Sequence, residues 1–79
     1  MSTVNGKKLS FAVMHQNIFY PGIGDIRKEL SCEDTGLSRG VKMTIDEPFV
    51  LVETKTKAGQ AVTIPVPITN FSHLVLARE

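Results

Sequence analysis

Residues 41–67, VKMTIDEPFVLVETKTKAGQAVTIPVP, decide the fold of this chain. Apolar and polar side chains alternate over 41–45, which is the period of a β-strand with one buried face. A turn-forming Asp-Glu-Pro segment at 46–48 precedes residues 49–52, which are apolar on both faces, as in a strand covered on two sides. The glycine-containing segment 56–60 then predicts a hairpin loop. The stretch indicates consecutive antiparallel strands.

The strand after this loop carries two prolines. Val62, Ile64 and Val66 share one face, whereas Pro65 and Pro67 fall on the other. Because proline has no N–H to donate, the end of this strand cannot lie inside a continuous hydrogen-bonded ladder. We expect an edge or a strand end there.

Two further strands are expected outside this stretch. Alternation predicts one over 8–14, and residues 73–77 follow a short helical turn at 69–72 that supplies Phe71 as an apolar plug. Taking the apolar face of each strand gives a predicted core of Leu9, Phe11, Val13, Val41, Met43, Ile45, Leu51, Val62, Ile64, Val66 and Leu74.

Residues 21–40 are expected to form one long excursion between the strand predicted over 8–14 and the strand that begins at residue 41. Three turn formers lie within 21–25, and the remainder is polar and glycine-rich. Ile26 and Leu30 are spaced for one helix face, so a short helix is predicted over 25–32. Long loops often carry function, so this excursion is predicted to be the most mobile region and the partner contact.

The order of strand, long loop, three strands, helical turn and last strand over residues 8–77 resembles the Src-homology-type small barrel. Residues 62–75, VTIPVPITNFSHLV, are similar to its fourth strand, helical turn and fifth strand. The resemblance implies a mainly β chain forming a closed five-strand barrel. Peptide binding is not carried over, because Tyr20 stands alone and the chain has no Trp.

Composition limits the chain to one globular domain. Its 79 residues can fill a single core, expected over residues 8–79 after a flexible N-terminal arm at 1–7. A net charge of +1 does not draw the chain strongly onto a phosphate backbone. The single cysteine, Cys32, fits a reducing compartment, and no apolar stretch is long enough to cross a membrane. We expect a cytoplasmic protein without a membrane partner.

Few side chains in the sequence indicate a catalytic, metal-binding or anion-binding site. Cys32 with His15 or His73 offers a thiol and a base, but no spacing rule brings them together, and no metal-ligand motif occurs. Residues 22–25 offer backbone N–H groups to an anion, although turn formation explains their glycines. We therefore expect no catalytic residue, no metal site and no cofactor, and the chain is not expected to be an enzyme.

The function expected is a non-enzymatic protein-binding module that docks on a larger protein, like an accessory or inhibitor protein of the phage type. Its expected binding residues are Phe19, Tyr20, Ile23, Arg27, Lys28, Leu37 and Arg39. The alternative is a small nucleic-acid-binding barrel with a lysine strip of Lys7, Lys8, Lys42, Lys55 and Lys57. A homo-oligomer stays open as well, because so small a domain buries little surface.

Overall fold

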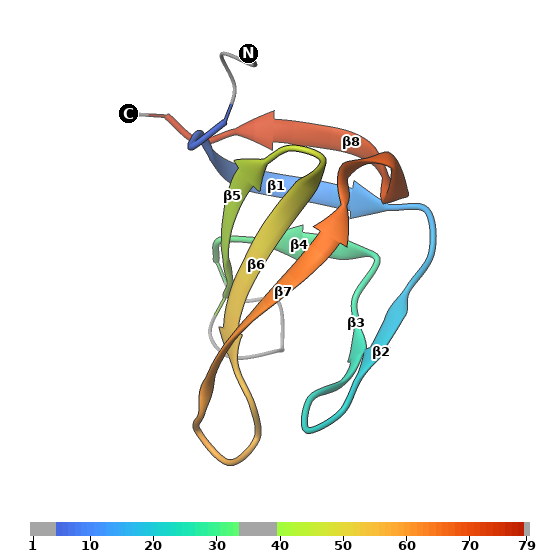
Figure 1. Cartoon of the computed structure of the whole chain (residues 1–79), viewed down its shortest axis with the longest axis vertical. Coiled ribbons are helices and arrows are strands. Elements are labelled where there is room, and N and C mark those ends of the chain that lie inside the picture. Colours follow the sequence, from blue (N-terminus) through green and yellow to red (C-terminus); the bar gives the residue numbers. More distant parts are fainter. Residues whose placement is uncertain (1–4, 34–39, 79) are drawn as a thin grey trace.

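The computed structural model describes residues 5–33 and 40–78. They form eight strands and one short 3-10 helix (Figure 1). In chain order these are β1 (Lys8–Met14), β2 (Ile18–Tyr20), β3 (Gly24–Ile26), β4 (Glu29–Ser31), β5 (Lys42–Asp46), β6 (Phe49–Lys55), β7 (Ala61–Pro67), η1 (Ile68–Asn70) and β8 (Phe71–Leu76). No helix within the described residues is long and apolar enough to cross a membrane.

The strands make one curled sheet and a separate hairpin. The six-stranded sheet runs β4-β1-β5-β6-β7, with β8 paired to β1, while β2 and β3 pair with each other. β4 and β5 take successive parts of one edge of β1, since Ser31 pairs with Phe11 and Met43 with Leu9. β8 lies along the opposite edge of β1 (Figure 1).

The expectation of a closed barrel is wrong, because the sheet is an open half-barrel. No ladder joins β7 to β8 within the described residues. Pro65 pairs with Leu51 of β6, and Pro67 pairs with Phe49. Proline has no N–H to donate, so the backbone nitrogen atoms of both prolines point away from β6, toward the free side of β7. β7 is therefore an edge strand, which is one of the two outcomes, edge or strand end, that the prolines left open.

The predicted strands over 8–14, 41–46, 49–52, 62–66 and 73–77 are confirmed, with shifted ends in several of them. The helix predicted over 25–32 is wrong, and strands β3 and β4 replace much of the described part of the long loop predicted around it; residues 34–39 of that loop lie outside the described residues. Residues 24–26 pair with β2 and residues 29–31 pair with β1, so neighbouring strands supply the hydrogen bonds that a helix would have made within itself. Ile26 and Leu30 are both buried, but from two strands rather than from one helix face.

A β-bulge changes which side chains of β1 enter the core. The pairing of β1 with β8 shifts between Leu9 and Phe11, so the alternation of buried residues is interrupted there. Leu9, Ala12 and Met14 are buried, whereas Phe11 and Val13, both predicted in the core, are half-buried on the other face.

Within the described residues, the β5–β6–β7 meander supplies six of the fourteen buried hydrophobic residues of the core. Val50, Val52 and Val66 have no solvent exposure, and Ile64 is 5% exposed. Leu51, predicted in the core, is half-buried on the opposite face, because Val50 and Val52 take the inner positions of β6. Thr54 continues that inner row and is buried.

β4 and β5 lie end to end along one edge of β1. The N–H of Val41 donates to the Ser31 carbonyl at 3.3 Å, which joins the end of β4 to the start of β5. Gly40 has φ of 91°, and a Cβ there would overlap the carbonyl oxygen of Glu33. Only glycine fits this close approach without a shift of the backbone.

The expected N-terminal arm is attached to β5 over its described part. The Gly6 N–H donates to the Ile45 carbonyl at 2.7 Å, and the Ile45 N–H donates to the Lys7 carbonyl at 2.9 Å. The Asn5 Oδ1 accepts the Glu47 N–H at 2.9 Å. Residues 1–4 lie outside the described residues.

Candidate functional site

The β2–β3 hairpin ends in a tight turn whose sequence explains its shape. Ile23 donates its N–H to the Tyr20 carbonyl at 3.1 Å, closing a four-residue turn. Pro21 has the φ required at the second position, and Gly22 has φ of 89° at the third, which together are typical of a type II turn. The Ile23 N–H is used inside the turn, so it is not available to the anion considered for residues 22–25.

The β6–β7 hairpin ends in a five-residue loop that is also internally bonded. The Thr56 N–H donates to the Gln60 carbonyl, and the Gly59 N–H to the Thr56 carbonyl, each at 2.9 Å. The Thr56 Oγ1 accepts the Gln60 N–H at 3.2 Å. Gly59 adopts φ of 89°, a conformation that favours glycine. The loop therefore has a defined shape before any partner arrives.

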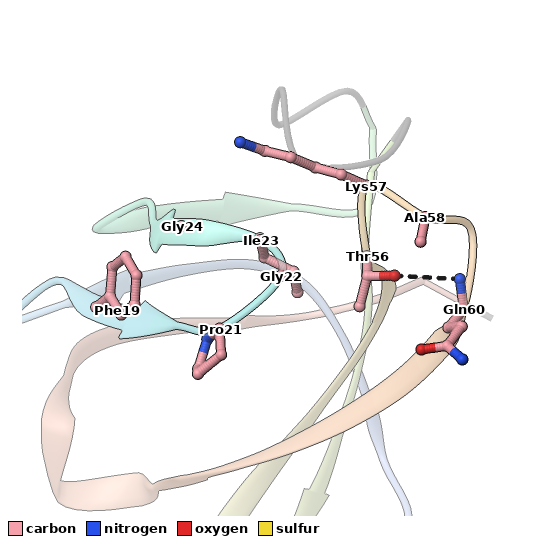
Figure 2. Close-up of a pocket in the computed structure, with 9 residues that line it drawn as sticks. All are labelled: Phe19, Pro21, Gly22, Ile23, Gly24, Thr56, Lys57, Ala58 and Gln60. Atoms are coloured by element: carbon pink, nitrogen blue, oxygen red, sulfur yellow. Dashed lines mark hydrogen bonds between the residues drawn. The ribbon is translucent and has the colours of Figure 1, made fainter.

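The two hairpin tips meet, and an open pocket lies on the surface that they form (Figure 2). The Lys57 N–H donates to the Gly22 carbonyl at 3.0 Å, and a Cβ on Gly22 would lie 3.4 Å from the Thr56 Cγ2. The pocket has a volume of about 510 Å³ and is lined by Phe19, Pro21, Gly22, Ile23, Gly24, Thr56, Lys57, Ala58 and Gln60. Residues more than thirty positions apart thus share one surface.

This pocket is mostly apolar and carries one cationic side chain. Ile23 is buried, whereas the Phe19 ring is 70% exposed at the same surface. Figure 2 shows the Lys57 side chain extending from the β6–β7 loop toward the side of the β2–β3 hairpin. An exposed aromatic ring beside an apolar depression suits contact with an apolar side chain of another molecule.

The binding residues expected from the sequence lie in different parts of the structure. Phe19 and Ile23 line the pocket. Tyr20 is half-buried and packs against the core, so much of its ring serves the fold. Arg27 and Lys28 are exposed in the link between β3 and β4. Leu37 and Arg39 lie outside the described residues.

The lysines of the expected strip lie in different places. Lys57 lines the hairpin pocket, whereas Lys7 and Lys8 line a second pocket of about 290 Å³ together with Gly6, Ala77 and Arg78. Lys42 pairs with the acidic Glu53, and Lys55 pairs with Ala61. In Figure 1 the start of β1 and the end of β8 lie at the opposite end of the molecule from the β6–β7 hairpin tip. One group of cations therefore gathers at the chain ends.

The candidate thiol and its candidate bases flank different edges of β1. Cys32 follows β4, and its Sγ donates to the Leu9 carbonyl at 2.7 Å. His73 belongs to β8 on the other edge, pairs with Val13, and places its ring 6.4 Å from that of Phe11. His15 is exposed after β1. The described part of the chain contains no group of three His, Cys, Asp or Glu residues placed to hold a metal.

Three of the nine residues that line the pocket were not expected from the sequence. Thr56, Ala58 and Gln60 were assigned only to a hairpin loop, because the contact that brings them to Gly22 is a backbone hydrogen bond. Such a bond leaves no trace in side-chain pattern. Comparison of the chain with protein-family models, with curated proteins and with solved structures finds no match.

Proposed function

We propose that this chain is a protein-binding module that docks on a larger protein through the hairpin pocket, as accessory and inhibitor proteins of the phage type do. The observation that carries the proposal is Phe19, a large apolar side chain that is 70% exposed at the rim of an apolar pocket. Exposed aromatic residues next to a depression are typical of the anchors that dominate binding energy at protein interfaces.

The pocket also indicates the chemistry of the partner. The pocket is lined by apolar side chains, among them Phe19, Pro21 and Ala58, and Lys57 adds a positive charge. A protruding apolar side chain with a neighbouring carboxylate matches both features. Because both hairpin tips are held by their own hydrogen bonds, little ordering is needed on binding, which favours affinity.

The fold proposed for this module is the Src-homology type. Its support is the order in which β1 is followed by an excursion, three consecutive antiparallel strands, the 3-10 helix η1 and a last strand that returns to β1. The function proposed does not depend on that assignment, because one small barrel serves many unrelated functions.

The test is affinity capture from the host cell with tagged wild-type protein, Phe19→Ala and Phe49→Ala. Phe49 is 40% exposed but does not line the pocket, so it controls for general loss of exposed apolar surface. We expect one partner that wild type and Phe49→Ala retain and Phe19→Ala loses, with a Kd for the purified pair at least about 30-fold weaker. Retention by Phe19→Ala would contradict the proposal.

The second candidate is nucleic-acid binding at the pocket lined by Lys7, Lys8 and Arg78, where two of the expected lysines share a depression with another cation. Capture that disappears after nuclease treatment would favour it. Binding to labelled oligonucleotides should then weaken with added salt and be lost in a Lys7→Glu/Lys8→Glu variant, while Lys55→Glu retains it. Binding lost equally in both variants would argue against that pocket.

A further inference from the structure

Strand β8 has an open edge. It pairs with β1 on one side, and no strand within the described residues pairs with the other side. The Ala77 N–H donates to the Lys8 carbonyl at 2.9 Å, toward the β1 side. Because backbone direction alternates along a strand, the N–H and C=O groups of Leu74 and Leu76 face the open side.

This edge lacks the protection that the other long edge has. Free strand edges are usually protected by lysine, proline or a cover, because their backbone groups can pair with another chain. β7 carries Pro65 and Pro67, whereas no charged residue and no proline occurs in β8. β8 instead exposes apolar side chains, with Val75 37% and Leu76 48% exposed.

We propose that β8 pairs antiparallel with β8 of a second copy of this chain, about a two-fold axis that passes through Val75. In this register Leu74 and the partner's Leu76 exchange their outward N–H and C=O groups, and symmetry repeats the exchange. Val75 then lies directly opposite the partner's Val75, on the face where it already neighbours Phe11 of β1. Both exposed apolar residues of the edge become covered.

A second copy fits this edge because the edge is complementary to itself. An antiparallel two-fold places Leu74 beside the partner's Leu76, so apolar residues meet apolar residues, and an uncharged strand meets no like charge. The prolines of β7 remove N–H groups from the sheet's other long edge, so β8 is the long edge of the described sheet that is open to pairing. A two-fold contact of this kind closes as a dimer rather than extending into a fibre.

The interface lies apart from the hairpin pocket, so its test is independent of the proposed function. Sedimentation equilibrium of the full chain should show a dimer, and Phe19→Ala should dimerise equally well. Amide exchange at Leu74 and Leu76 should slow as protein concentration rises, because dimerisation gives these N–H groups partners that the described residues of one subunit do not supply. A chain that remains monomeric at millimolar concentration overturns the proposal.

Two substitutions with one control test the register. Leu76→Pro removes an outward N–H from each subunit, as the prolines of β7 do, and should raise the Kd of the dimer roughly 30-fold. Val75→Lys brings two charges face to face and should raise the Kd about tenfold or more. Thr63→Lys puts the same charge on exposed β7 and should leave the dimer unchanged.

Each remaining outcome decides against the proposal. A dimer that survives both Leu76→Pro and Val75→Lys, with circular dichroism showing folded variants, would place the contact elsewhere. A monomer that binds an extended peptide along β8 would assign the edge to a different protein. Equal weakening by Thr63→Lys would show that charge, rather than the β8 edge, controls association.

Discussion

The two halves of the sheet differ in how their strands come together. In the β5–β6–β7 half, each strand pairs with its neighbour in sequence through an uninterrupted register, and the inner row contains Val50, Val52, Ile64 and Val66. In the β1–β4–β8 half, strands from distant parts of the chain meet, and bulges shift the register twice. Alternation identifies the buried face only where no bulge interrupts it, because one extra residue moves every later side chain to the other face.

The largest expected effect compares one apolar residue from each half. Ile64 is 5% exposed in the meander, so Ile64→Ala should lower the free energy of unfolding by about 3 kcal/mol, through lost burial and a residual cavity. Phe11 was expected in the core but is half-buried on the outer face, so Phe11→Ala should cost less despite removing a larger side chain. Urea unfolding of both variants measures the difference.

The opposite ranking would break the comparison. If Phe11→Ala were the more destabilising change, the β1 register in solution would be the simple alternation and the bulge at Ser10 would be absent. A cost below about 0.5 kcal/mol for Ile64→Ala would contradict the packing of Ile64 in the core.

The next effect concerns the seam between the halves, where β4 passes into β5. Gly40→Ala should cost about 2 to 3 kcal/mol, because it combines an unfavourable positive φ with overlap of the Glu33 carbonyl. Gly59→Ala is the matched control, since Gly59 has nearly the same φ with nothing within 4 Å of the added Cβ. Thermal unfolding of both variants separates the steric contribution from the conformational one. Equal costs would contradict the close approach at the seam.

The strands predicted from the sequence were those whose hydrogen-bond partners lie nearby in the chain or whose pattern is long. The 25–32 segment failed for the opposite reason. Ile26 and Leu30 fit a helix by spacing, but β2 and β1 offered their backbone groups instead, and pairing with a sheet overrides a weak helix preference in so short a segment. The prediction of a closed barrel was wrong because the sequence does not say whether two prolines end a strand or leave an edge free.

The candidate site was predicted in part for a similar reason. Phe19 and Ile23 stood out as apolar residues beside a turn-rich segment, and both line the pocket. The contribution of the β6–β7 loop to the pocket was missed because the loop contacts Gly22 through a hydrogen bond between main-chain atoms. Nearly any residue type can make such a bond. Arg27 and Lys28 were expected at the site from their place in a supposed loop, but the strands on either side carry them into the β3–β4 link.

The smallest expected effect is a gain in stability at the one polar residue of the buried inner rows. Thr54 is buried on β6, opposite Val62, and its Oγ1 has no hydrogen-bond partner within the described residues. A buried hydroxyl without a partner has lost its bonds to water and gained none in return. Valine has nearly the same shape, so Thr54→Val should raise the free energy of unfolding by about 1 kcal/mol.

Thr63→Val, on the exposed face of the neighbouring β7, should change the free energy of unfolding little and controls for strand preference. A loss of stability in Thr54→Val alone would mean that the hydroxyl has a partner in solution, and the inner row of the meander would then not be purely apolar in its energetics.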